Sequence, residues 1–298
     1  MDGITVMCRR ESHGTQYLDE RLEPYWIYKL NQPCDMTQIQ RPPPQYKLVS
    51  HDQLNEVYCS LLAQLSLSNT HSDQLQRRGL NHREIASRHY RTLPREGRSR
   101  IAKALHERFG DGLCGVPGFY YHEEGYWSLW AIPGLVIPLR DMIGRIVALK
   151  IRADDPKYPK YSYVSAAKKG GPSAVKAIHV PLWDGSTDTV VVTEGELKAD
   201  VCTVLGNTLT ISLPGIGSWR LALDVIQQLR PSTVRIALDQ DPPENKTACK
   251  QVKAARDGLY RQLNRVKGLD VCIDEWDLYE DGKGLDDVLL KLQQEKAA

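Results

Sequence analysis

The sequence predicts an α/β protein, α+β overall, in which a parallel sheet with helices on both faces follows a small helical and β-hairpin N-terminal subdomain. Between residues 190 and 294, short β-branched or apolar segments alternate with helical patterns, as they do in parallel sheets. Between residues 50 and 152, helical periodicity gives way to two stretches of alternating polarity, which are typical of antiparallel hairpins.

The composition is that of an ordinary globular protein. The 298 residues are 41% hydrophobic and 26% charged, which suits one large or two medium domains. Early charges exclude a signal peptide, and no apolar run reaches membrane-spanning length, so no membrane partner is expected. The 7 cysteines lack Cys-x-x-Cys spacing, which favours a reducing, cytoplasmic compartment. The net charge of +2 gives no global argument for nucleic-acid binding.

Three regions are expected along the chain. Residues 1–47 mix polarities and contain the run Pro42-Pro43-Pro44, which predicts an N-terminal arm or linker. Residues 48–185 form the predicted N-terminal subdomain, and residues 186–298 form the parallel-sheet domain.

The predicted N-terminal subdomain begins with helices. Ser50 and Gln53 form a capping-box pattern ahead of apolar residues at helical spacing. Further helices are expected over residues 73–78, from Asn81, and over residues 99–109.

Two hairpins and a loop follow these helices. Polarity alternates over residues 119–130 and again over 135–152, around a turn at Asp141 to Gly144. Prolines interrupt residues 154–161, which predicts a surface loop.

The parallel-sheet domain is predicted from alternating strands and helices. The strands are expected at residues 190–193, 208–213, 234–238 and 270–276. The helices are expected at residues 196–205, 218–229, 247–266 and 286–294.

Acidic residues follow the buried segments of this domain. Glu194 ends the first strand, Asp239 and Asp241 follow the third, and Asp286 and Asp287 begin the last helix. Carboxylates at the carboxyl ends of parallel strands meet at one edge of the sheet, where they repel one another unless a positive charge lies between them. Oxygen ligands of this kind suit Mg²⁺ or Mn²⁺, and such metals support phosphate chemistry.

Each acid taken alone also has a structural explanation. A glutamate at a helix N-terminus such as Glu194 is favoured by the helix dipole. The pair Asp239 and Asp241 could start a turn, and capping explains one of Asp286 and Asp287. Their common position at one sheet edge favours the metal site.

Basic residues gather before the parallel-sheet domain, and tyrosines at 158, 161 and 163 lie among them. This pattern predicts a groove that follows a phosphate backbone and stacks single-stranded bases. A solvated strand face with extended lysine stems is the structural alternative. The basic residues are Arg140, Arg145, Lys150, Arg152, Lys157, Lys160, Lys168, Lys169 and Lys176.

Four motifs in the second half of the chain resemble the Toprim superfamily, which includes bacterial DNA primases, topoisomerases and some nucleases. The resemblance is closest to Toprim-like primase domains of phage and plasmid replication proteins. The motifs are Glu194-Gly195-Glu196, Pro214-Gly215-Ile216-Gly217-Ser218-Trp219, Asp239-Gln240-Asp241 and Lys283-Gly284-Leu285-Asp286-Asp287.

Upstream motifs are similar to the catalytic core of bacterial DNA primase. They are the helix pair at residues 75–85, the hairpin Ile137-Pro138-Leu139-Arg140-Asp141 with Gly144-Arg145, and Pro159-Lys160-Tyr161. The resemblance therefore covers roughly residues 72–290.

The resemblance implies Mg²⁺- or Mn²⁺-dependent nucleotidyl transfer on a nucleic-acid template, in the DNA replication system of a phage, a plasmid or another mobile genetic element. Single-stranded DNA and nucleoside triphosphates are the implied partners, and a separate helicase is a candidate partner. The implied catalytic residues are Glu194, Asp239 and Asp241, and the implied metal ligands are these three with Asp286 and Asp287. The implied nucleic-acid or nucleotide contacts are Arg140, Arg145, Lys150, Arg152, Lys160 and Lys198.

Two departures from the family pattern leave alternatives open. Lys198 stands where bacterial primases usually carry an acid, and Pro242-Pro243 replaces a small glycine-bearing turn. The alternatives are a Toprim nuclease that hydrolyses phosphodiesters and a non-catalytic module that binds single-stranded nucleic acid.

Overall fold

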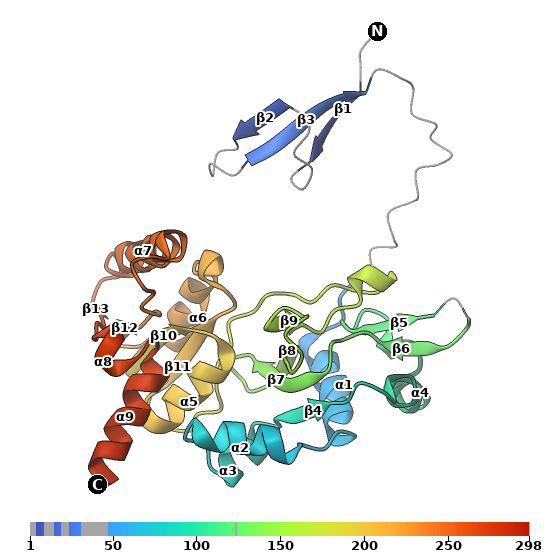
Figure 1. Ribbon diagram of the computed structural model, residues 1–298, viewed down its shortest axis with the longest axis horizontal. Coiled ribbons are helices and arrows are strands. Elements are labelled where there is room, and N and C mark those ends of the chain that lie inside the picture. Colours follow the sequence, from blue (N-terminus) through green and yellow to red (C-terminus); the bar gives the residue numbers. More distant parts are fainter. Residues whose placement is uncertain (1–3, 9–14, 19–23, 31–46, 123, 298) are drawn as a thin grey trace. The chain divides into compact units, whose positions relative to one another are not determined.

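The computed structural model describes residues 4–8, 15–18, 24–30, 47–122 and 124–297 (Figure 1). The chain divides into two compact units, Met1–Gln45 and Tyr46–Ala298.

The first unit contains a three-stranded antiparallel sheet of β1 (Ile4–Cys8), β2 (Thr15–Leu18) and β3 (Pro24–Leu30), with β3 in the centre. The prediction of an arm or linker over residues 1–47 is therefore wrong for these strands. β3 is rich in aromatic residues, which favour strands even where polarity does not alternate. Residues 31–46, with the proline run, lie outside the described residues.

The helices of the second unit begin near their predicted caps. The Ser50 hydroxyl accepts a hydrogen bond from the Gln53 N–H, which confirms the predicted start of the first helix. The second helix begins earlier than predicted, because the Ser68 hydroxyl accepts from the His71 N–H and caps it. The helices are α1 (His51–Ala63), α2 (Asn69–Arg77), α3 (His82–Ser87) and α4 (Arg98–Phe109).

Both predicted hairpins are present. β5 (Phe119–Tyr121) pairs antiparallel with β6 (Trp127–Leu129). β7 (Gly134–Arg140) pairs with β8 (Ile146–Ala153) in a sheet of order β4-β7-β8-β9. β4 (Arg91–Leu93) and β9 (Tyr161–Tyr163) were not predicted, because three residues are too few to show a period.

The parallel sheet lies in the second half of the chain and has the order β11-β10-β12-β13. Its strands are β10 (Thr189–Glu194), β11 (Thr210–Leu213), β12 (Thr233–Ile236) and β13 (Asp270–Ile273). Its helices are α5 (Glu196–Gly206), α6 (Leu221–Leu229), α7 (Lys246–Leu263), α8 (Leu278–Asp281) and α9 (Leu285–Ala297). Short 3₁₀ helices occupy Gly110–Leu113, Ala167–Lys169 and Ile216–Ser218.

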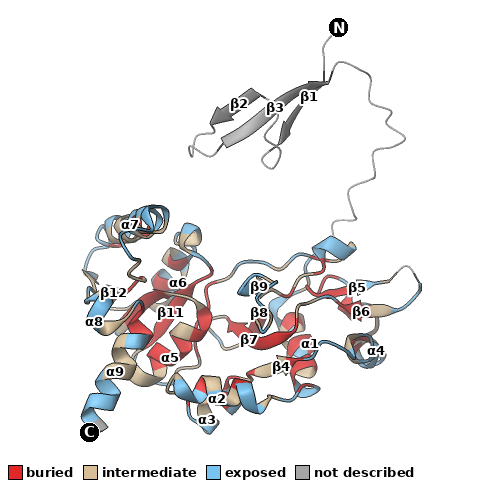
Figure 2. Ribbon diagram, in the orientation of Figure 1, coloured by how far each residue is buried: buried red, intermediate tan, exposed pale blue. Residues whose placement is uncertain are grey.

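Alternate side chains of β10 pack on opposite faces of this sheet. Val192 lies in a buried cluster with Ile226 of α6 and Leu259 of α7. Val191 lies in a separate cluster with Cys202 of α5 and Leu285 of α9. The strands are buried between these helices (Figure 2). The predicted fold class, a parallel sheet with helices on both faces after a helical and hairpin region, is confirmed.

Apolar packing joins the two regions of the second unit. Leu75 of α2 and Ile85 of α3 share a buried cluster with Leu197 and Val201 of α5. The border predicted at residues 185 and 186 therefore falls within one compact unit. Among the described helices, none combines the length and the apolar character that crossing a membrane requires.

Candidate active site

The site begins at the carboxyl end of β10, the central strand that carries Glu194. Gly195 follows with φ 85°, a conformation that glycine adopts without steric cost, and α5 begins at the next residue. β12 lies beside β10 in parallel, and its chain continues to Asp239 and Asp241. The two strands therefore deliver Glu194 and Asp239 to the same edge of the sheet.

Glu194 lies in an environment that disfavours its charge. Burial raises the pKa of its carboxyl from 4.5 to about 7, and the negative charge of Asp239 adds to this rise. Among the described residues, none donates a hydrogen bond to its buried Oε1 atom. Glu194 is therefore a carboxylate that needs a proton or a cation in the folded protein.

We expect the substitution Glu194→Gln to stabilise the metal-free protein at pH 8 and to have little effect near pH 4. The pKa of Glu194 is higher in the folded state, so stability falls as the pH rises from about 4.5 to about 7. The gain from the substitution should reach about 2–3 kcal/mol at pH 8. Urea unfolding in EDTA at both pH values measures it, with the exposed Glu107→Gln as control. An equal effect of Glu194→Gln at both pH values would contradict this assignment.

Two lysines pair with the aspartates of the cluster. Lys198, in the first part of α5, donates a hydrogen bond from Nζ to Asp239 Oδ1, and its Nζ lies 3.6 Å from Asp286 Oδ1. Lys283 Nζ lies 2.5 Å from Asp241 Oδ1. The structure thus brings the predicted acids together, but with two ammonium groups among them.

The two acids at the start of α9 differ in their surroundings. Asp286 is buried, which raises the pKa of its carboxyl, and its Oδ2 accepts a hydrogen bond of 3.2 Å from Arg78. Asp287 is exposed, and its Oδ2 accepts from the Gly284 N–H at 3.0 Å. Asp287 therefore caps the chain where α9 begins, whereas Asp286 faces the cluster.

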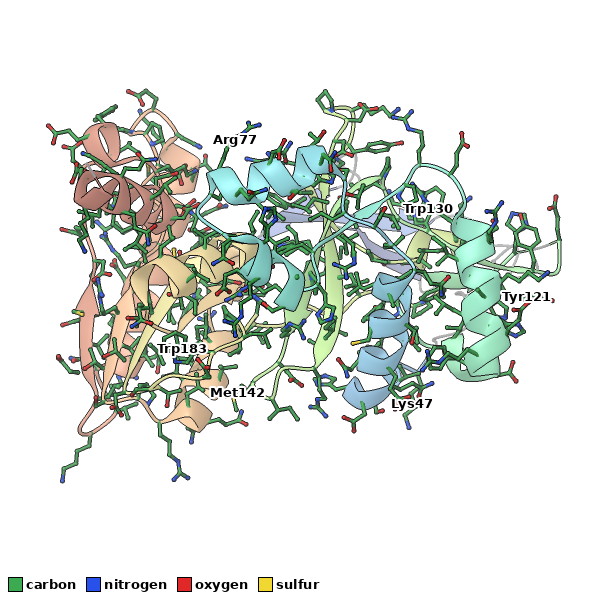
Figure 3. The ribbon with its side chains drawn as sticks, turned by 90° about the horizontal axis from the view of Figure 1, so that it is seen from below. Lys47, Arg77, Tyr121, Trp130, Met142 and Trp183 are labelled. Atoms are coloured by element: carbon green, nitrogen blue, oxygen red, sulfur yellow. The ribbon has the colours of Figure 1, made fainter. Side chains whose placement is uncertain are left out.

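A cavity of about 330 Å³ opens over this cluster. Its acidic residues follow β10 and β12 and begin α9, and its facing basic residues lie on β8, just before β9 and just after α2. Figure 3 labels Arg77 at that end of α2, the residue before Arg78. The lining residues are Arg78, Lys150, Lys160, Tyr161, Glu194, Gly195, Glu196, Leu197, Lys198, Asp239, Lys283, Asp286 and Asp287.

The basic wall combines lysines with a tyrosine. Lys150 Nζ lies 2.7 Å from Glu196 Oε1, in an ion pair that is largely buried. Lys160 is exposed, and its Nζ lies 5.7 Å from the ring centroid of Tyr161, which is 38% exposed. Lys160 and Tyr161 thus present a positive charge and an aromatic face to the cavity.

The other predicted nucleic-acid contacts are engaged within the protein. Arg140, a predicted nucleic-acid or nucleotide contact, is 6% exposed and donates to the Gly144 carbonyl at 2.7 Å. Arg145 pairs with Asp52 at 2.8 Å, and Arg152 donates to Gln74 at 2.7 Å. None of the three is among the described residues that line the cavity.

Sequence reasoning missed three polar contacts that join the two regions of the second unit. Arg78 bonds Asp286 and Glu196 pairs with Lys150, although both Arg78 and Glu196 stand inside quoted motifs. Asp200 is 2% exposed, and its Oδ1 lies 3.1 Å from Arg88 Nε. A charged residue at a buried position of a predicted helix could have indicated such a partner.

The donor set suits a hard divalent cation, with a restriction. Glu194 offers a buried oxygen without a hydrogen bond, and such an oxygen is available to bind a cation. Lys198 and Lys283 occupy oxygens of Asp239 and Asp241. Over the described ranges, no group of three or more His, Cys, Asp or Glu residues is arranged to hold a metal. Lys283 is 49% exposed, so Asp241 is the aspartate whose lysine partner is the more easily displaced.

The fold is similar to that of bacterial primase catalytic cores. The chain is similar to a DNA primase domain from Pseudomonas aeruginosa, with a TM-score of 0.60 and 16% identity, over 82% of this chain and 77% of that one. It is similar to the zinc-binding and RNA polymerase domains of Aquifex aeolicus primase, with a TM-score of 0.58 and 15% identity. That match covers 84% of this chain and 60% of the Aquifex chain.

A DnaG primase catalytic domain bound to ssDNA matches with a TM-score of 0.57 and 16% identity, over 83% of this chain and 76% of that one. A family model described as "Domain of unknown function (DUF3854)" matches residues 182–296. No curated protein matches the sequence. The predicted primase-like fold is confirmed, and the relation to phage and plasmid proteins stays a prediction.

Proposed function

We propose that this protein is a Toprim-like, Mg²⁺- or Mn²⁺-dependent nucleotidyltransferase of the DNA primase type. The observation that best supports this proposal is the cavity, in which Glu194, Asp239 and Asp286 face Lys160 and Tyr161. The acids suit a metal and a proton acceptor, and the opposite wall suits a phosphate and a base.

Glu194 is the proposed proton acceptor. A carboxyl with a pKa of about 7 takes a proton efficiently from an attacking hydroxyl near neutral pH. Alternatively, Glu194 would join Asp241 in holding the divalent ion, which supplies charge stabilisation to the phosphoryl group during transfer. Lys160 would position the triphosphate or the template, and Tyr161 would stack a base.

Single-stranded DNA and nucleoside triphosphates are the proposed substrates. The solved DnaG catalytic domain of the same fold was bound to ssDNA. The motif resemblance supports a role in phage or plasmid replication, with a separate helicase as a candidate partner.

Incubation of labelled single-stranded DNA with Mg²⁺, with and without ribonucleotides, tests the proposal. Nucleotide-dependent products longer than the input support nucleotidyl transfer. Shortening of the label without nucleotides would instead establish a nuclease.

A non-catalytic module that binds single strands is the second candidate. The pairing of Asp239 with Lys198 and of Asp241 with Lys283 favours it, because paired carboxylates are less available to a metal. Binding that is unchanged by EDTA, together with no turnover under any nucleotide mixture, would decide for this candidate.

We expect Tyr161→Ala to weaken single-strand binding by about 5- to 100-fold, because one stacked base contributes about 1–3 kcal/mol. Lys160→Ala should weaken binding on every sequence and lower the slope of log affinity against log salt by about 1. Fluorescence anisotropy over a salt series measures both effects. Lys176→Ala is the matched control, since Lys176 is exposed but does not line the cavity. Equal effects of Lys176→Ala and Lys160→Ala would show that the cavity does not bind the single strand.

A further inference from the structure

The ammonium group of Lys198 is enclosed by acids of the candidate site. Its Nζ donates to Asp239 Oδ1 and lies 3.6 Å from Asp286 Oδ1. The side chains are 14%, 18% and 9% exposed for Lys198, Asp239 and Asp286, so the charges meet out of bulk water. Asp286 Oδ1 has no hydrogen-bond partner within the part of the chain that the structure describes. The oxygen therefore faces the lysine charge and little else.

Gly284 leaves the space that this ammonium group occupies. A Cβ atom at position 284 would lie 2.3 Å from Lys198 Nζ and 2.6 Å from Asp286 Oδ1. The backbone of Gly284 lies outside the left-handed region, so its conformation does not require glycine. A side chain at position 284 would therefore require Lys198 or the Asp286 carboxylate to move.

The two lysines of the cluster are held differently. Lys198 is 14% exposed and lies between two carboxylates. Lys283 is 49% exposed and pairs with Asp241 alone, so another cation at Asp241 can displace it into solvent. Lys198 is therefore a fixed cation of the site, whereas Lys283 is a displaceable one.

We propose that Lys198 is a resident cation that takes the place of a divalent ion between Asp239 and Asp286, so that the site binds one divalent ion instead of two. This inference rests on the proposed metal-dependent function of the same site. A second divalent ion at this position would meet the ammonium charge at contact distance, and the two would repel. Glu194 and Asp241 are left to bind the single ion.

The number of Mn²⁺ ions bound per chain tests the inference directly. Equilibrium dialysis with detection of Mn²⁺ by electron paramagnetic resonance gives the count without any activity measurement. We expect one ion for the wild type and two for Lys198→Ala. Lys198→Gln, which retains most of the side-chain volume, is a second variant in case the alanine variant unfolds, and it should also bind two. Lys283→Ala is the matched control and should keep one ion, bound more tightly.

Gly284→Ala probes the space around the ammonium group while retaining the lysine. We expect it to displace Lys198 without admitting a second ion, because the added methyl group fills the position that the ion would take. A count of two in Gly284→Ala would show that the second ion binds elsewhere and would overturn the site between Asp239 and Asp286.

Two results separate this inference from the proposed function. Equal counts in the wild type, Lys198→Ala and Lys198→Gln would overturn the resident cation, whatever the extension assay gives. A wild type that binds no ion and extends no strand, with one ion gained in Lys198→Ala, would refute the proposed nucleotidyl transfer but support the resident cation.

Discussion

Asp239→Asn is expected to lower Mg²⁺-dependent nucleotide incorporation by about 100-fold or more, while the fold remains intact. General acid–base catalysis contributes about 10²–10⁴ in rate, and the charge of Asp239 adds to the effect of burial in raising the pKa of Glu194, the proposed proton acceptor. Asn keeps the shape of the side chain but removes the charge that faces Glu194 and Lys198. Extension of a labelled strand, measured as kcat and KM with thermal melting in parallel, records the effect.

Asp224→Asn serves as the control for this substitution. Asp224 is exposed on α6 and does not line the cavity, so its substitution should leave incorporation within about twofold of the wild type. Undiminished incorporation by Asp239→Asn would show that Asp239 is not needed for catalysis, and it would refute the proposed site.

Asp200→Ala is expected to lower the free energy of unfolding by about 3–5 kcal/mol, because it leaves the buried Arg88 with Glu84 as its remaining charge partner and the buried Tyr90 hydroxyl without its acceptor. Asp200 on α5 accepts from Arg88 Nε at 3.1 Å and from the Tyr90 hydroxyl, and its Oδ1 lies 3.4 Å from His179 Nε2. Burial would raise the pKa of Asp200, but His179 and Arg88 hold it below its usual value. This contribution is present above the pKa of the unfolded carboxyl and is lost as the pH falls.

Urea unfolding at pH 7 measures this loss. Tyr90→Phe removes a single hydrogen bond to Asp200 and should cost about 1–2 kcal/mol. Asp257→Ala, at an ion pair that is 44% exposed on the acid side, should cost less than about 1 kcal/mol. A loss below that for Asp200→Ala would show that the buried network does not hold α3 and α5 together.

The regular elements with long periodic patterns were predictable. α1 was located from its cap at Ser50 and its apolar spacing, and the β7–β8 hairpin was located from its alternating polarity. Short elements without a period, such as β4 and α8, could not be found in this way. The strands within residues 4–30 were not predicted, because polarity does not alternate there and a proline run follows, and this pattern indicates an arm or linker.

The neighbourhood of each charged side chain could not be predicted in the same way. Arg140 and Lys160 are both basic residues of the same region, yet one is buried against Gly144 and the other faces the cavity. Sequence spacing gives the face of a strand but not what packs over it. Contacts with His89 and His179, which lie far from Arg140 along the chain, accompany its burial.

The order of the acids along the chain was sufficient to predict that Glu194, Asp239 and Asp286 meet at one edge of a parallel sheet, because the carboxyl ends of such strands share that edge. Only the tertiary structure revealed what stands between them. Lys198 lies among the acids, in space that Gly284, 86 positions further along the chain, leaves open. Contacts between side chains so far apart in the sequence depend on the tertiary arrangement of the loops, and a local sequence pattern does not predict them.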